Sequence, residues 1–313
     1  MNTPSNSVPE RSSDSPGAPP GAASAALPTR PLYWSVRREL WENRSLYVAP
    51  LAAAAVVLFG FLISMVGHPD RIRAVLALGP EKQGIAMAMP HNVAAILIIM
   101  TSLVVAVFYC LDALHGERRD RSILFWKSLP VSDLTTVVSK AGIPLVVLPL
   151  VTFVTIVALQ LIMLLLTTAT LLASGLGADM ASVNWPFLEE SLVLLYGLAV
   201  AALWYAPIYG WLLMVSAWAR RTTFLWAMLT PLAICVLEAI AFHTSHFASM
   251  LKYRLVGGFG AAFVGRTHGD PFVGLAQVDP LKFLSTPGLW IGLAVAAAFL
   301  AGAVWLRRHR DPI

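Results

Sequence analysis

The sequence predicts an all-α integral membrane protein with six transmembrane helices. Of its 313 residues, 58% are hydrophobic and only 12% are charged, against about 45–50% and about 25% in soluble globular domains. A helix needs about 20 residues to cross a hydrocarbon layer that is about 30 Å thick. Six runs that hold almost no charge meet this length, at about 47–67, 92–111, 141–173, 191–218, 222–243 and 283–306.

Helices rather than barrel strands are predicted for these runs. Only helices and closed barrels satisfy all backbone polar groups in lipid, and barrel strands alternate apolar and polar residues. Residues 53–64 are instead apolar at almost every position, which excludes the barrel. The run 141–173 exceeds the bilayer thickness, so we expect it to tilt, to project, or to break near Gly142 and Pro144.

The N-terminal part divides into a tail and an entry helix. Residues 1–29 hold six prolines among many Ser, Ala and Gly, and we expect a disordered cytoplasmic tail before a six-span membrane domain at 30–313. From Leu32 to Ser45, the residues Tyr33, Val36, Leu40 and Trp41 share one face, whereas Arg37, Arg38, Glu39, Glu42 and Asn43 lie elsewhere. This pattern is typical of an interfacial amphipathic helix. It fits a plain membrane anchor and a partner contact equally well.

The distribution of positive charge predicts the orientation. Segments on one side of the six spans carry 15 of the 22 Lys and Arg residues, and those on the other side carry 7. Since Lys and Arg accumulate on the cytoplasmic side, both termini are expected there. The net charge of +5 is explained by this bias and by anionic headgroups, so no nucleic-acid partner is expected. The predicted location is the plasma membrane, or the inner membrane of a Gram-negative cell.

The cytoplasmic loop at 112–140 is the most informative segment. A charge cluster at 117–121 follows Gly116, and an apolar stretch at 123–126 comes next. Pro130 ends any helix, and Ser132 or Asp133 can cap the helix that leads into the third span. We therefore expect a short amphipathic helix across the cytoplasmic ends of the spans.

This loop resembles that of the permease subunits of ABC-2 class ATP-binding-cassette exporters. In that family a Glu is followed, after four intervening residues, by Thr or Ser, an apolar stretch, and Leu-Pro-[Val/Ile]-[Ser/Thr]. Here these positions are Glu117, Ser122, the run 123–126 and residues 129–132. The resemblance covers residues 33–306 as an architecture and implies that 117–133 contains a coupling helix that docks into an ATPase subunit. The residues expected to couple to the ATPase are Glu117, Arg118, Arg119, Arg121, Ser122, Phe125, Trp126, Leu129, Pro130 and Ser132. Solvated charges and interfacial aromatics are the alternative explanation.

The resemblance also implies a function. The chain would be the permease subunit of an ATP-driven exporter, and it would form a translocation route with a second copy or a sister permease. The sequence has no Gly-x-x-x-x-Gly-Lys-[Ser/Thr] phosphate loop, so we expect no enzyme activity and no bound cofactor, with ATP and Mg used by separate ATPase subunits.

Two other functions are weighed against this one. A gradient-driven carrier is the first alternative, although the halves show no convincing repeat. Glu189 and Glu190 resemble the start of the Glu-Glu-x-x-x-Arg motif of CAAX-type intramembrane proteases, but position 194 is Leu. The pair is better explained as the acidic first turn of the fourth span.

Three further features lie in or after the fifth span. Glu238 is the only charged residue inside a span, so it is a candidate for gating or substrate binding, or for a structural hydrogen bond. His243 and His246 have a metal-ligand spacing, but further ligands are missing nearby and no metal site is expected. The outer segment 244–282 includes a Gly-rich stretch too short to span. The resemblance implies re-entrant or interfacial helices there, and a solvent loop is the alternative.

Overall fold

The computed structural model describes residues 31–65, 80–120, 132–173, 175, 187–263 and 275–309. The predicted tail at 1–29 lies outside these residues. The described part is almost entirely helical, and it contains one isolated bridge between Phe263 and Val278. Its elements are α1 (Pro31–Glu42), α2 (Ser45–Ser64), α4 (Pro80–Asp112), α5 (His115–Arg119), α7 (Asp133–Gly142), a π-helical turn η1 (Ile143–Val147), α8 (Leu148–Ala173), α10 (Phe187–Trp218), α11 (Thr223–Phe242), α12 (His246–Ala262), a 3-10 turn η2 (Leu275–Gln277), α13 (Pro280–Ser285) and α14 (Pro287–His309).

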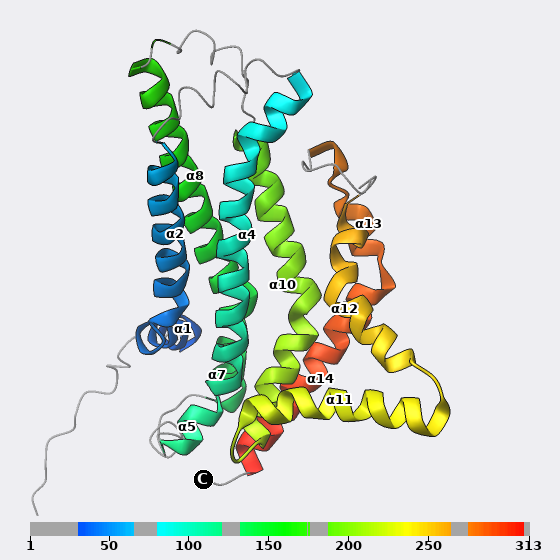
Figure 1. Cartoon of the computed structure of the whole chain (residues 1–313). Helices are drawn as coiled ribbons and strands as arrows, with labels where there is room; N and C mark the ends of the chain where they lie inside the picture. The colour runs from blue at the N-terminus through cyan, green and yellow to red at the C-terminus, as the bar shows by residue number, and fades with distance from the viewer. Residues whose placement is uncertain are drawn as a thin grey trace, which may run out of the picture. The chain divides into compact units, whose positions relative to one another are not determined.

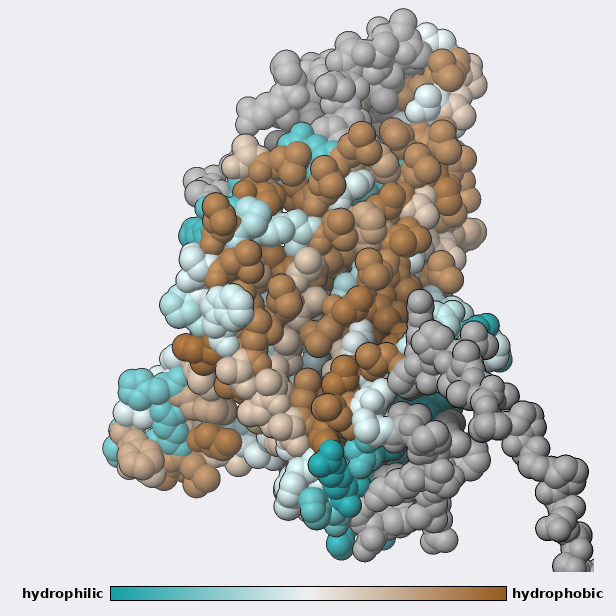
Figure 2. All heavy atoms as spheres, turned by 180° about the vertical axis from the view of Figure 1, so that it is seen from behind, coloured by the Kyte–Doolittle hydropathy of each residue, from teal (hydrophilic) through white to brown (hydrophobic). Residues whose placement is uncertain are grey.

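Six helical segments are long and apolar enough to cross a membrane. They are Ser45–Ser64, Ala86–Arg119, Asp133–Ala173, Phe187–Trp218, Thr223–Phe242 and Pro287–His309. Figure 2 shows a broad apolar surface over the long helices, with polar residues gathered near the lower edge. Such a surface is unfavourable in water and suits lipid acyl chains. The all-α, multi-pass membrane class predicted from the sequence is therefore confirmed.

The long helices α2, α4, α8 and α10 pack against one another (Figure 1). Buried side chains such as Phe61, Ile98 and Ile156 join α2, α4 and α8. Helix α10 also makes its most extensive contact with α14. At this crossing a Cβ on Gly210 would lie 3.2 Å from the carbonyl oxygen of Ala296. The missing side chain therefore allows the two backbones to approach closely.

The long third apolar run contains a local change of helix type. Residues Ile143–Val147 form the π-helical turn η1 between α7 and α8, close to the predicted break at Gly142 and Pro144. The amide of Leu148 donates to the carbonyl of Ile143, five residues earlier. Pro144 lacks an amide hydrogen and cannot continue an α-helical ladder. The wider turn accommodates it without ending the helix.

The sixth apolar run differs from its predicted bounds. The run at 283–306 was expected to form one helix, but α13 ends at Ser285 and α14 begins at Pro287. Thr286 between them is extended, with φ −70° and ψ 117°. A residue that precedes proline is disfavoured in the α region because its backbone clashes with the proline ring. Pro287 is instead favourable at the first position of the new helix.

Helix α11 is the least embedded of the six long apolar segments. In Figure 1 it runs across the bundle rather than along it, beside the ends of α4 and α10. Ala227 is its only buried residue, and the indole of Trp211 donates to the carbonyl of Ala227 at 3.2 Å. Most of its large apolar side chains are exposed. Residues 222–243 therefore form the expected apolar helix, but α12 is the helix that returns along α10.

Helix α12 approaches α10 through glycine, which leads to a stability prediction. A Cβ on Gly258 would lie 2.7 Å from the ring of Trp204, whose indole is fully buried and donates to the carbonyl of Arg254 at 2.8 Å. Gly258→Ala should therefore lower the free energy of unfolding by about 1–3 kcal/mol, the usual cost of overpacking. Chemical unfolding in detergent micelles measures this loss.

A matched control lies two residues away on the same helix. A Cβ on Gly260 meets nothing within 4 Å, so Gly260→Ala should leave the free energy of unfolding unchanged or raise it by about 0.5–1 kcal/mol. Equal losses from the two substitutions would mean that the contact with Trp204 does not determine the effect.

Candidate functional site

The short helix α5 begins directly after α4 and is attached to α10 at its start. The backbone amides of Leu114 and His115 donate to the Ser216 hydroxyl oxygen, at 3.0 and 2.9 Å. The first amides of a helix have no partner inside the helix. Ser216, which is fully buried, satisfies two such amides and holds the first turn of α5 against the last turns of α10.

Arg118 provides a second attachment to α10. Its Nη1 donates to the carbonyl oxygens of Ala217 at 2.7 Å and Ala219 at 3.4 Å, and the residue is only 5% exposed. These carbonyls belong to the end of α10, where a positive charge is favourable. Arg118 thus caps α10 and is buried between the two helices.

Glu117 connects α5 to three other helices. Its Oε1 accepts from Lys140 Nζ at 3.1 Å and from Arg38 Nη2 at 3.4 Å, and its Oε2 accepts from Arg307 Nη1. These partners lie on α7, α1 and α14. The Glu117 side chain is 10% exposed. One carboxylate therefore joins segments that are far apart in the sequence.

Glu39 forms a second buried centre beside Glu117. Its Oε1 accepts from Lys140 Nζ at 2.8 Å and from Arg38 Nη2 at 3.1 Å, and the Tyr109 hydroxyl donates to its Oε2 at 2.9 Å. The residue is completely buried. The sequence pattern places Glu39 away from the apolar face of the entry helix and does not predict that its carboxylate is buried among ion pairs. Val36 and Leu40 of the same helix pack against the core.

Asp133 completes the set of ion pairs. Its Oδ1 accepts from Arg307 Nε at 2.9 Å. The neighbouring Ser132 caps α7, because its hydroxyl accepts from the Thr135 amide at 3.1 Å; of the two caps expected from the sequence, the structure uses Ser132. We call the following six residues the ion-pair network: Arg38, Glu39, Glu117, Asp133, Lys140 and Arg307.

The ion-pair network balances three positive with three negative side chains. Buried ions lose their hydration and need several well-placed partners to offset that loss. Each of the two most buried carboxylates, on Glu39 and Glu117, has more than one donor. Removing one member would leave an uncompensated charge, so the network is expected to hold a single arrangement. It lies where α1, α5 and the last turn of α14 meet, which we call the ion-pair end (Figure 1).

The structure describes part of the predicted coupling segment. Glu117 and Arg118 are buried in the contacts above, whereas Arg119 is exposed and pairs with Asp120 at 3.2 Å. Ser132 caps α7. The remaining predicted coupling residues lie outside the described residues: Arg121, Ser122, Phe125, Trp126, Leu129 and Pro130. The structure thus describes the two ends of the coupling segment, one in α5 and the other at the start of α7.

The solvent-exposed face of α1 combines aromatic and basic side chains. Trp34 and Trp41 are 59% and 69% exposed, and the guanidinium of Arg37 lies over both rings, 5.3 and 5.1 Å from their centres. Partial burial raises the pKa of the Glu42 carboxyl, and the nearby Arg38 opposes this shift. Aromatic and basic side chains together suit the headgroup layer.

Glu238 forms structural hydrogen bonds at the corner between α11 and α12. Its carboxylate accepts from the Thr244 hydroxyl at 2.9 Å and from the amides of His246 and Phe247, both at 2.8 Å. These are the first free amides of α12, which a carboxylate caps favourably. These contacts agree with a structural hydrogen bond, which was one of the roles considered for Glu238 from the sequence.

Among the described residues, no group of three His, Cys, Asp or Glu side chains could hold a metal ion.

The acidic pair Glu189 and Glu190 lies in the first turn of α10, as expected for a helix start. No sequence pattern connected Arg38 and Arg307 with Glu117, or Tyr109 with Glu39. The sequence gives only a weak indication of the ion-pair network: Lys140 directly precedes one apolar run, and Arg307 directly follows another. Such positions are equally well explained by the positive charge at membrane ends.

Comparison with known proteins gives no match to any family model, curated protein or solved structure. The fold by itself defines a multi-pass membrane protein. Its described site is a balanced ion-pair network that fixes a short helix to the ends of the long helices.

Proposed function

We propose that this chain is the permease subunit of an ATP-driven exporter, and that α5 and the segment after it transmit motion from a separate ATPase subunit. The observation that supports the proposal is the attachment of α5. Glu117 joins it to α1, α7 and α14, and Arg118 joins it to α10. A lever needs this rigidity, because a loosely held loop would absorb the motion before it reached the spans.

The attachment distributes force among several spans. Helix α7 continues through η1 into α8, and α10 and α14 are themselves long apolar helices. A displacement of α5 would therefore be transmitted to at least three spans through contacts that have little freedom. Conformational coupling of this kind is carried by contiguous networks of packed side chains, ion pairs and rigid helices. We propose that the ion-pair network performs this task.

The remaining elements have a place in the same proposal. The ion-pair end would face the cytoplasm, α1 would lie in the headgroup layer, and residues 117–133 would dock into the ATPase subunit, which binds ATP and Mg. A second copy or a sister permease would complete the translocation route. The surrounding lipid would cover the apolar faces of the long helices.

Copurification with the ATPase tests the proposal. We expect the tagged chain, extracted in mild detergent, to bring down a stoichiometric ATPase subunit that has a phosphate-binding loop. Phe125→Asp should abolish this association because it places a charge on the predicted docking surface. Arg220→Asp is the control, since Arg220 is exposed on the turn between α10 and α11, outside the coupling segment. Substrate transport by the chain alone, driven by an ion gradient, would contradict the proposal and support a carrier.

A further inference from the structure

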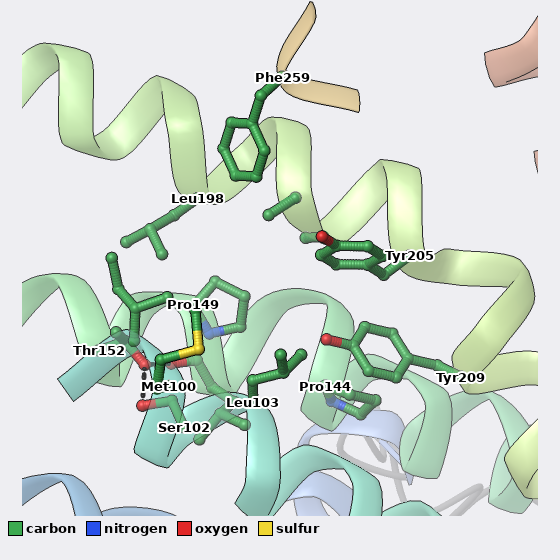
Figure 3. Close-up of a pocket in the computed structure, with 14 residues that line it drawn as sticks. Met100, Ser102, Leu103, Pro144, Pro149, Thr152, Leu198, Tyr205, Tyr209 and Phe259 are labelled. Carbon is green, nitrogen blue, oxygen red and sulfur yellow. Dashed lines mark hydrogen bonds between the residues drawn. The ribbon is translucent and has the colours of Figure 1, made fainter. Parts of the chain in front are cut away.

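A cavity of about 100 Å³ lies among α4, η1, α8 and α10, with one residue of α12 beside it (Figure 3). Apolar side chains and two prolines form most of its lining. Met100, Leu148 and Leu198 contribute aliphatic surface, and Phe259 comes from α12. Apart from Phe259, its lining residues come from three candidate spans. The cavity is independent of the ion-pair network.

Polar groups in the cavity are few, and one of them is unused. The Thr152 hydroxyl donates to the Ser102 hydroxyl at 2.7 Å, and the Tyr205 hydroxyl donates to the carbonyl of Leu255 at 3.0 Å. The Tyr209 hydroxyl points into the cavity in Figure 3 and has no hydrogen-bond partner among the described residues. Tyr209 is only 6% exposed. A polar group at membrane depth is costly unless it has a partner, so the Tyr209 hydroxyl offers one free hydrogen-bonding position to a molecule in the cavity.

The entrance and the wall are consistent with a ligand from the hydrocarbon layer. Met100 and Phe259 are 53% and 37% exposed, so the cavity opens on an apolar surface. The π-helical turn forms part of the wall through Pro144. Single π-helical turns within longer helices occur frequently at functional sites. Binding pockets typically combine an apolar lining with a small number of placed polar groups.

We propose that this cavity binds a small lipophilic molecule that carries a single hydroxyl or carbonyl oxygen. The oxygen forms a hydrogen bond with the Tyr209 hydroxyl, and the hydrocarbon part lies against Met100, Leu198 and Phe259. A dry cavity of about 150 Å³ accommodates benzene. The smaller cavity here therefore takes the oxygen and the adjoining carbons, while the rest of the chain extends through the entrance into lipid.

Photolabelling of the full chain in phosphatidylcholine nanodiscs tests this proposal. The probe is a six-carbon primary alcohol that carries a diazirine, and the labelled residues are found by mass spectrometry. We expect labels on cavity residues, and we expect 1-hexanol to compete with them. Tyr209→Phe should weaken labelling about fivefold, the loss expected for one hydrogen bond. Ala202→Leu should abolish it, because Ala202 lines the cavity and is buried.

Tyr196→Phe is the matched control on the same helix. The Tyr196 hydroxyl donates to the carbonyl of Ala262 at 3.2 Å and does not line the cavity, so its loss should not change the labelling. Unchanged labelling in Tyr209→Phe would overturn the proposal, as would labels restricted to exposed residues such as Val104. Cavity labelling by a diazirine-tailed phosphatidylcholine that 1-hexanol fails to displace would also overturn it, since the occupant would then be a plain acyl chain. None of these outcomes depends on an ATPase subunit.

Discussion

Lys140→Met should lower the free energy of unfolding by about 3–5 kcal/mol, the cost of removing one partner from a buried ion pair. The Lys140 ammonium lies 2.8 Å from Glu39 Oε1 and 3.1 Å from Glu117 Oε1, and its side chain is 3% exposed. Met has nearly the same length and keeps the apolar contacts of the side chain. It leaves two buried carboxylates with one cation fewer, and Arg38 then remains as the cation that contacts both. Chemical unfolding in detergent micelles, followed by tryptophan fluorescence, measures the loss.

Two further variants identify the origin of this effect. Adding Glu39→Gln to Lys140→Met should recover part of the stability, because it removes one of the two opposed negative charges. Arg119→Met should have no measurable effect, since the pair between Arg119 and Asp120 is exposed and such pairs contribute little. Equal destabilisation by Arg119→Met and Lys140→Met would show that the ion-pair network has no special role.

Glu117→Ala should reduce the rate of ATP-driven transport at least tenfold, which corresponds to a loss of about 1.4 kcal/mol of coupling free energy. The protein should still insert into the membrane. The substitution removes the carboxylate that Lys140, Arg38 and Arg307 surround. Three positive charges then face one another, and α5 loses its attachment to α1, α7 and α14. Transport and ATP hydrolysis measured on the reconstituted complex give the result.

Glu117 acts in this prediction as a positioning residue, because its side chain is buried against its own chain. The variant should therefore still bind the ATPase subunit with nearly unchanged affinity, while hydrolysis no longer drives transport. Glu117→Asp keeps the charge and should restore part of the coupling. Loss of ATPase binding together with intact stability would instead indicate direct docking by Glu117. Full coupling in Glu117→Ala would refute both roles.

Only part of the structure of the coupling segment could be predicted from the sequence. The Ser132 cap follows from local chemistry, since a side-chain hydroxyl acts on the nearest backbone groups. The burial of Glu117 and Arg118 does not follow in this way. A charged cluster beside a membrane run is equally consistent with solvated side chains, and only the approach of α7, α10 and α14 removes these two from water.

The apolar runs determined by themselves that the chain is helical and membrane-spanning, because the bilayer imposes a length and excludes unpaired backbone groups. The tertiary structure decided which charges meet. Glu39 and Lys140 are 101 positions apart, and Glu117 and Arg307 are 190 apart, so no local pattern encodes their contact. It also decided that α11 runs across the bundle and that Glu238 caps α12. Length and hydropathy indicate that a segment prefers lipid, whereas its direction and its polar partners depend on how the other helices pack.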